Sequence, residues 1–142
     1  LQRNRAAKRI TETEDAAMLK LGEEFDKAEC LMLSEVKLLL EADRETKIKK
    51  SGEASLNEIF QKTLAYAQRF STLKNEDTIK EVRSLLVEAE VFKPFENAQL
   101  ANLGCQDSDE AFALIPSLAN KISGEDLQHY LNEIQNFTKF QG

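Results

Sequence analysis

The stretch Asn75-Glu-Asp-Thr-Ile-Lys-Glu-Val-Arg-Ser-Leu-Leu86 decides the fold class. It opens with asparagine, a preferred helix N-cap, and the two acids that follow lie at the positive end of the helix dipole. Ile79, Val82, Leu85 and Leu86 recur at the spacing of one helix face. The stretch therefore predicts a helix with a buried apolar side.

Similar start and stop signals recur toward both ends of the chain. Further helices are expected to open at Ser34, at the capping box Ser55-Leu-Asn-Glu58, at Pro94, at Asp107 and at Ser123. Gly104 ends the helix from Pro94, and Pro116 splits the helix from Asp107. Because the chain has two prolines, five glycines and no run of alternating β-branched residues, the predicted fold class is all-α.

The first two helices are predicted in more detail. The first runs from its N-cap Ser34 and frays near residue 48. Residues 43–55 are almost wholly charged or small, which predicts the helix end followed by a solvated linker. The second is expected to keep one apolar face, formed by Leu56, Ile59, Phe60, Ala67 and Phe70.

The chain divides into three predicted regions. Residues 1–15 form a disordered leader, residues 16–72 an extended arm with two helices, and residues 73–142 a bundle of four to five helices. The bundle has short polar connections and enough apolar faces to be compact alone, whereas two helices and an arm cannot bury their own apolar residues.

An apolar set in the first forty residues lacks an evident cover. It consists of Leu19, Leu21, Phe25, Leu31, Leu33, Val36 and Leu40. The physical chemistry leaves two explanations open: another protein covers part of the set, or the arm folds back over the C-terminal bundle.

Charge and composition exclude several function classes. The net charge is −6, with +4 in the first ten residues and −10 in the rest, so the body should repel nucleic acid phosphates. No apolar run approaches the ~20 residues of a membrane span, so no membrane association is expected. Cys30 and Cys105 lie 75 residues apart without a CxxC spacing, which predicts neither a zinc site nor a disulfide and favours a reducing compartment.

The supply of catalytic groups is thin. His129 is the only histidine, and neither cysteine has a cationic neighbour in the sequence that would activate it. The loop from Asp107 lacks the glycine that a calcium loop needs at its sixth position. We therefore expect no catalytic residue, no metal and no cofactor, and we expect that the chain is not an enzyme. Phe70 and Phe92 alternate with basic residues, but both fit helix-packing positions better than RNA stacking.

Five stretches carry a resemblance to a known family. They are Leu33-Ser-Glu-Val-Lys-Leu-Leu-Leu-Glu41, Lys62-Thr-Leu-Ala-Tyr-Ala-Gln-Arg-Phe70, Phe95-Glu-Asn-Ala-Gln-Leu-Ala-Asn-Leu103, Glu110-Ala-Phe-Ala-Leu-Ile-Pro-Ser-Leu118 and Leu127-Gln-His-Tyr-Leu-Asn-Glu-Ile-Gln135. In order and spacing, over roughly residues 16–141, the chain resembles the fourth-subunit family of RNA polymerase II. The fourth stretch is fairly specific because proline inside an apolar helical run is rare.

The resemblance implies a nuclear stalk protein without an active site of its own. Members of the family pair with the seventh subunit through the arm and first helices, so the apolar set above becomes the expected contact, with the arm adding a strand to the partner's sheet. The stalk docks on the core polymerase and supports initiation and RNA exit. RNA contact is left mainly to the partner. The C-terminal bundle, similar to the helicase and ribonuclease D C-terminal (HRDC-like) domain, is expected to recruit RNA-processing, termination or phosphatase factors, and shuttling to the cytoplasm belongs to the same expectation.

The chain departs from the family at one turn, and other functions stay open. Relatives carry Cys-Pro after the Asn-Leu pair where this chain has Gly104-Cys105, so the turn geometry there is its own. The alternatives are the counterpart subunit of another nuclear RNA polymerase, a stand-alone helical adaptor, and a nucleic-acid-binding helical bundle. An adaptor would be a stable monomer, and a nucleic-acid-binding bundle would bind RNA alone in a salt-dependent way.

Overall fold

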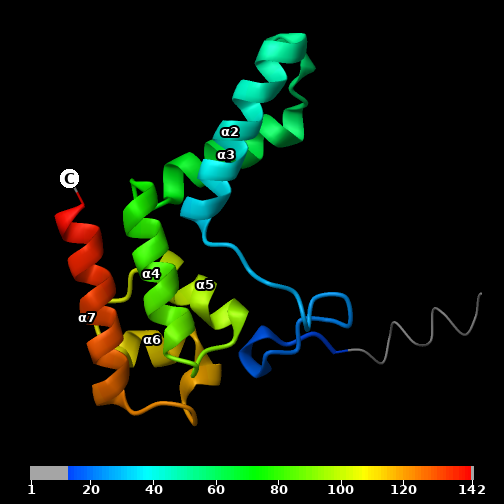
Figure 1. Cartoon of the computed structure of the whole chain (residues 1–142). Helices are drawn as coiled ribbons and strands as arrows, with labels where there is room; N and C mark the ends of the chain where they lie inside the picture. Colours follow the sequence, from blue (N-terminus) through cyan, green and yellow to red (C-terminus); the bar gives the residue numbers. More distant parts are fainter. Residues whose placement is uncertain (1–12, 142) are drawn as a thin grey trace, which may run out of the picture.

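The computed structural model describes residues 13–141 and confirms the all-α prediction (Figure 1). In this part of the chain the only strand-like pairing is an isolated bridge between Asp15 and Lys20. None of the helices within residues 13–141 is both long and apolar enough to span a membrane.

Six α-helices and three short 3-10 helices follow one another in the described residues. Their bounds are η1 Ala16–Met18, α2 Leu33–Ser51, η2 Glu53–Ser55, α3 Glu58–Phe70, α4 Glu76–Glu88, α5 Pro94–Leu103, α6 Ser108–Leu114, η3 Pro116–Leu118 and α7 Gly124–Phe140.

The elements form a bundle with a helical hairpin projecting from it (Figure 1). Helices α4 to α7 pack together, while α2 and α3 pair with each other and rise away from the bundle. The main core lies in the bundle and also includes Met32 and Leu73, the residues that enter and leave the hairpin. The predicted boundary at residue 72 and the HRDC-like likeness of the bundle stay predictions.

The helix starts predicted for the bundle are confirmed. The side chains of Asn75, Asp107 and Ser123 accept hydrogen bonds from backbone amides three residues ahead, over 2.8, 2.8 and 3.1 Å. Helix α5 begins at Pro94 and ends before Gly104, which is left-handed (φ 60°). Helix α6 ends at Leu114, and Pro116 opens η3 instead of continuing it.

The hairpin differs from the prediction at its ends. Helix α2 begins at Leu33, so Ser34 lies inside it, and the Ser34 hydroxyl accepts a bond from the Leu73 amide over 3.2 Å. The cap of α3 is Asn57, not Ser55, because its side chain accepts from the Phe60 amide over 2.7 Å.

The predicted solvated linker at residues 43–55 is wrong. Helix α2 continues to Ser51, and η2 follows after Gly52. Ion pairs of Asp43 with Lys47 and of Arg44 with Glu53 accompany these turns, and Lys49 and Lys50 lie at the negative end of the helix dipole. A run that is almost wholly charged or small is therefore compatible with an exposed helix.

The arm is not extended throughout. Asp15 and Lys20 exchange two backbone hydrogen bonds around η1, turns follow, and only residues 28–32 run without helix or turn into α2. Element η1 lies against η3 of the bundle. Residues 1–12 of the predicted disordered leader lie outside the described residues.

A buried carboxylate ties two parts of the bundle together. The Glu96 side chain is fully buried and accepts hydrogen bonds from the Lys93 amide (2.8 Å) and the Ser117 hydroxyl (2.6 Å). It also pairs with the Lys121 ammonium group, whose side chain is about a quarter exposed. The start of α5 is thereby fixed to η3 and to the connection that leads to α7.

Lys121→Met should destabilise the chain by about 2–4 kcal/mol, because it leaves the buried Glu96 carboxylate without its cation. Lys62→Met should change stability by less than about 0.5 kcal/mol, since Lys62 only pairs with Glu58 on an exposed helix face. Urea unfolding measures both variants. Combining Lys121→Met with Glu96→Leu should recover part of the loss, and a pair that unfolds as easily as Lys121→Met alone would contradict the assignment.

Candidate protein-interaction surface

The start of α2 is fastened to α4 by a clamp made by Arg83. Its Nε donates to Glu35 Oε2 over 3.1 Å, and its Nη2 donates to the Cys30 carbonyl over 3.1 Å and pairs with Glu35 Oε1. Glu35 also accepts from the Met32 amide over 2.8 Å. Both ionic side chains are only partly exposed, so the pair should exceed a surface salt bridge in strength.

Two more tethers hold the junction between hairpin and bundle. The Leu33 amide donates to Asn102 Oδ1 over 2.9 Å. At the exit of the hairpin, Gln141 accepts from the Lys74 amide (2.6 Å) and donates to the Thr72 carbonyl (2.8 Å). The predicted interaction residues on α2 therefore belong to a helix whose start is fixed to the bundle.

None of the seven residues predicted to contact a partner is buried in the described structure. Phe25 and Leu31 are 58% and 50% exposed, and the other five, Leu19, Leu21, Leu33, Val36 and Leu40, are partly buried. The α2 members Leu33, Val36 and Leu40 share one helix face by their spacing, while the rest lie along the arm. The assignment of this set to partner binding stays a prediction.

Four further apolar side chains are exposed on the hairpin and were missed as candidates. They are Leu39 on α2 and Ile59, Tyr66 and Phe70 on α3. Ala67 of the predicted apolar face is buried, together with Leu64, which was not predicted, whereas Ile59 and Phe70 were expected to face inward and are exposed. The positions of the two buried residues are roughly 60–140° around the helix from Ile59 and Phe70. The signal that was available is the i, i+4 pair of Tyr66 and Phe70, whose rings lie 4.7 Å apart.

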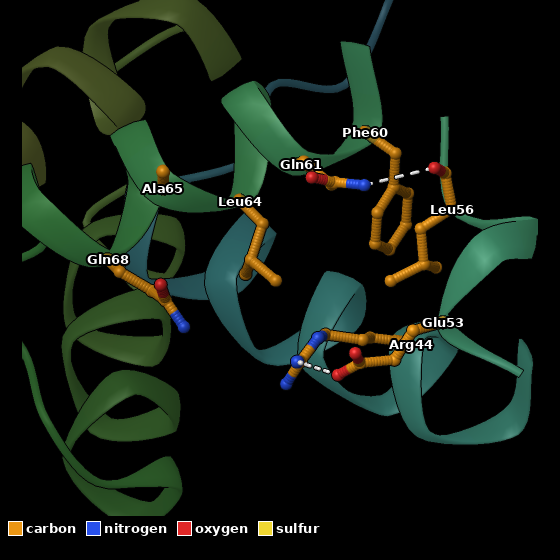
Figure 2. Close-up of a pocket in the computed structure, with 8 residues that line it drawn as sticks. All are labelled: Arg44, Glu53, Leu56, Phe60, Gln61, Leu64, Ala65 and Gln68. Carbon is orange, nitrogen blue, oxygen red and sulfur yellow. Dashed lines mark hydrogen bonds and ion pairs between the residues drawn. The ribbon is translucent and has the colours of Figure 1, made fainter. Parts of the chain in front are cut away.

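A cavity of about 360 Å³ lies between α2 and α3, toward the far end of the hairpin (Figure 2). Leu56, Phe60 and Leu64 form its apolar wall, and the Arg44–Glu53 ion pair (3.6 Å) lies opposite them. The lining has no nucleophile with a base beside it, so it suits a side chain of another protein better than a reaction.

His129 lies on α7, and Cys105 lies between α5 and α6. His129 is exposed, and its ring packs near Tyr130. Burial raises the pKa of the Cys105 thiol, and the nearby Glu110 carboxylate raises the pKa further, so the thiol stays protonated and weakly nucleophilic. Within residues 13–141 no cluster of three His, Cys, Asp or Glu side chains has the arrangement of a metal site.

Comparison with known proteins gives a consistent result. The sequence pattern of the family described as RNA polymerase Rpb4 matches residues 30–138. The chain is 40% identical over 129 residues to "DNA-directed RNA polymerase II subunit rpb4" of Schizosaccharomyces pombe, which covers 90% of this chain and 94% of that protein.

Two further relatives agree. "DNA-directed RNA polymerase II subunit 4" of Arabidopsis thaliana is 37% identical over 135 residues, covering 92% of this chain and 97% of that protein. "DNA-directed RNA polymerase II subunit rpb4" of Dictyostelium discoideum is 40% identical over 146 residues, covering 92% and 93%. The family match begins at residue 30, whose carbonyl accepts a hydrogen bond from Arg83.

Arg83→Met should loosen the entry of the hairpin, because it removes the bonds to Glu35 and to the Cys30 carbonyl. We expect amide exchange of residues 30–36 to accelerate about tenfold, equivalent to ~1.4 kcal/mol of local opening. Lys80→Met on the same helix should leave these amides unchanged, since Lys80 only pairs with the exposed Glu76. Unaltered protection of residues 30–36 in Arg83→Met would show that packing alone holds the junction.

Proposed function

Because the chain belongs to the RNA polymerase Rpb4 family, we propose that it is a non-catalytic subunit of DNA-directed RNA polymerase II. The observation that carries the proposal is the match to polymerase II fourth subunits of three organisms over at least nine-tenths of this chain and of each relative. The subunit acts in transcription in the nucleus, as part of an assembly whose active site lies in other chains.

The proposed partner is the seventh subunit, with which this chain forms the stalk of the polymerase. The exposed Phe25 and Leu31 support this pairing, because large apolar side chains at the surface are suited to burial in an interface. Leu31 lies two residues before α2, which opens with the partly buried Leu33 and Val36, and Phe25 lies in the turns of the arm. The seven apolar residues from Leu19 to Leu40 form the proposed contact.

The acidic bundle supports an indirect role toward RNA. Residues 75–142 contain twelve acids and five bases, so this part of the chain repels phosphates. Contact with the emerging RNA is therefore left mainly to the partner. The proposed role of the bundle is to recruit RNA-processing, termination or phosphatase factors. The proposal also includes shuttling of the subunit between nucleus and cytoplasm.

Phe25→Asp combined with Leu31→Asp should weaken pairing with the seventh subunit at least 100-fold, because two desolvated contacts would become buried unpaired charges. Isothermal titration with the purified seventh subunit measures the affinity. The circular dichroism of the variant should match that of the parent, since both side chains are exposed in the free chain.

Leu114→Asp is the matched control. Leu114 is 54% exposed but lies on α6, outside the proposed contact, and its variant should pair like the parent chain. If the parent chain itself stays monomeric in light scattering with the seventh subunit of polymerase II, the stalk proposal fails. Pairing with the counterpart from another nuclear polymerase instead would reassign the chain to that enzyme.

A further inference from the structure

The outer face of α3 carries an apolar stripe that the rest of the described chain does not cover. Ile59, Tyr66 and Phe70 are 78%, 57% and 47% exposed. Their spacing of i, i+7 and i+11 places them along one side of the helix, over a rise of about 16 Å. Single exposed apolar residues are ordinary, but three lie in line here on a projecting helix, with Thr63 between Ile59 and Tyr66.

The hairpin differs in charge from the bundle that supports it. Residues 33–72 contain seven bases and six acids, whereas residues 75–142 contain five bases and twelve acids. Two of the hairpin bases, Lys62 and Arg69, lie beside the stripe by their helical positions. Lys62 pairs with Glu58, but among the described residues no carboxylate forms an ion pair with Arg69. A complementary ligand is therefore apolar and acidic.

The details of the stripe favour a helix over a nucleic acid as that ligand. Stacked bases need open aromatic faces on a strongly basic surface. Here the rings of Tyr66 and Phe70 pack on each other at 46°, and the Arg69 guanidinium lies 5.2 Å from the Phe70 ring centre. The most exposed member, Ile59, offers no ring, whereas an aliphatic ridge fits all three positions.

We propose that the outer face of α3 binds an acidic amphipathic helix of a partner protein. The aliphatic side of that helix packs on Ile59, Tyr66 and Phe70, and its flanking carboxylates pair with Arg69 and, in exchange for Glu58, with Lys62. This surface is separate from the apolar residues of the arm and needs no pairing with the seventh subunit.

The test uses the full chain and a fluorescent synthetic peptide of about 18 residues, a length sufficient for several helical turns. The peptide carries leucine at i, i+4, i+7 and i+11, glutamate on both flanks and alanine elsewhere. We expect saturable binding by fluorescence anisotropy that weakens as salt rises from about 50 to about 300 mM. A second peptide with lysine in place of glutamate should bind at least tenfold more weakly.

Two variants and a control locate the site. Arg69→Glu and Ile59→Asp should each weaken binding of the acidic peptide at least tenfold, and both are exposed enough to leave thermal unfolding unchanged. Val87→Asp, at a 51% exposed position on α4, should bind within about twofold of the parent.

Several results would overturn the inference. They are equal binding of the lysine peptide, binding that ignores Arg69→Glu and Ile59→Asp, or no binding up to about 1 mM peptide. A single-stranded oligonucleotide that binds where the acidic peptide does not would assign the stripe to nucleic acid instead. Because the titration uses the chain alone, its failure is distinguishable from failure of the stalk proposal.

Discussion

The position of the hairpin depends on one junction, where the entry and exit of the hairpin meet the bundle. Helix α2 has nineteen residues, yet only Ser34 among them is buried, and α3 buries only Leu64 and Ala67. So little burial supplies only a few kcal/mol of hydrophobic stabilisation. The direction of the hairpin is therefore set at Met32 and Leu73, which belong to the bundle core, and by the hydrogen bond from the Leu73 amide to the Ser34 hydroxyl.

This arrangement separates two tasks within one chain. The bundle buries its apolar side chains and holds a fully buried carboxylate, Glu96, so it is the rigid part. The hairpin keeps most of its apolar side chains at least partly exposed, which costs stability that the bundle and the Arg83 clamp offset. Residues that are exposed on a fixed element are pre-organised, so a partner loses little conformational entropy in binding them.

Local chemistry explains how much of the fold could be predicted. The caps Asn75, Asp107 and Ser123 act on amides three residues away, and Pro116 blocks its own helix, so these features are readable from short stretches. The Arg83 clamp joins Arg83 to Glu35, 48 residues apart, and the sequence around neither residue predicts the contact. The family resemblance, by contrast, rested on several stretches in order, and the match over residues 30–138 confirms it.

The candidate surface shows why the same reasoning failed on α3. Apolar residues surround much of this helix, and its sequence does not say which side α2 will cover. With Leu64 and Ala67 buried, Ile59 and Phe70 lie on a different side of the helix and stay exposed. An apolar pattern wider than one face therefore does not reveal which of its residues are buried in the fold and which stay exposed. Only the position of the neighbouring helix separates them.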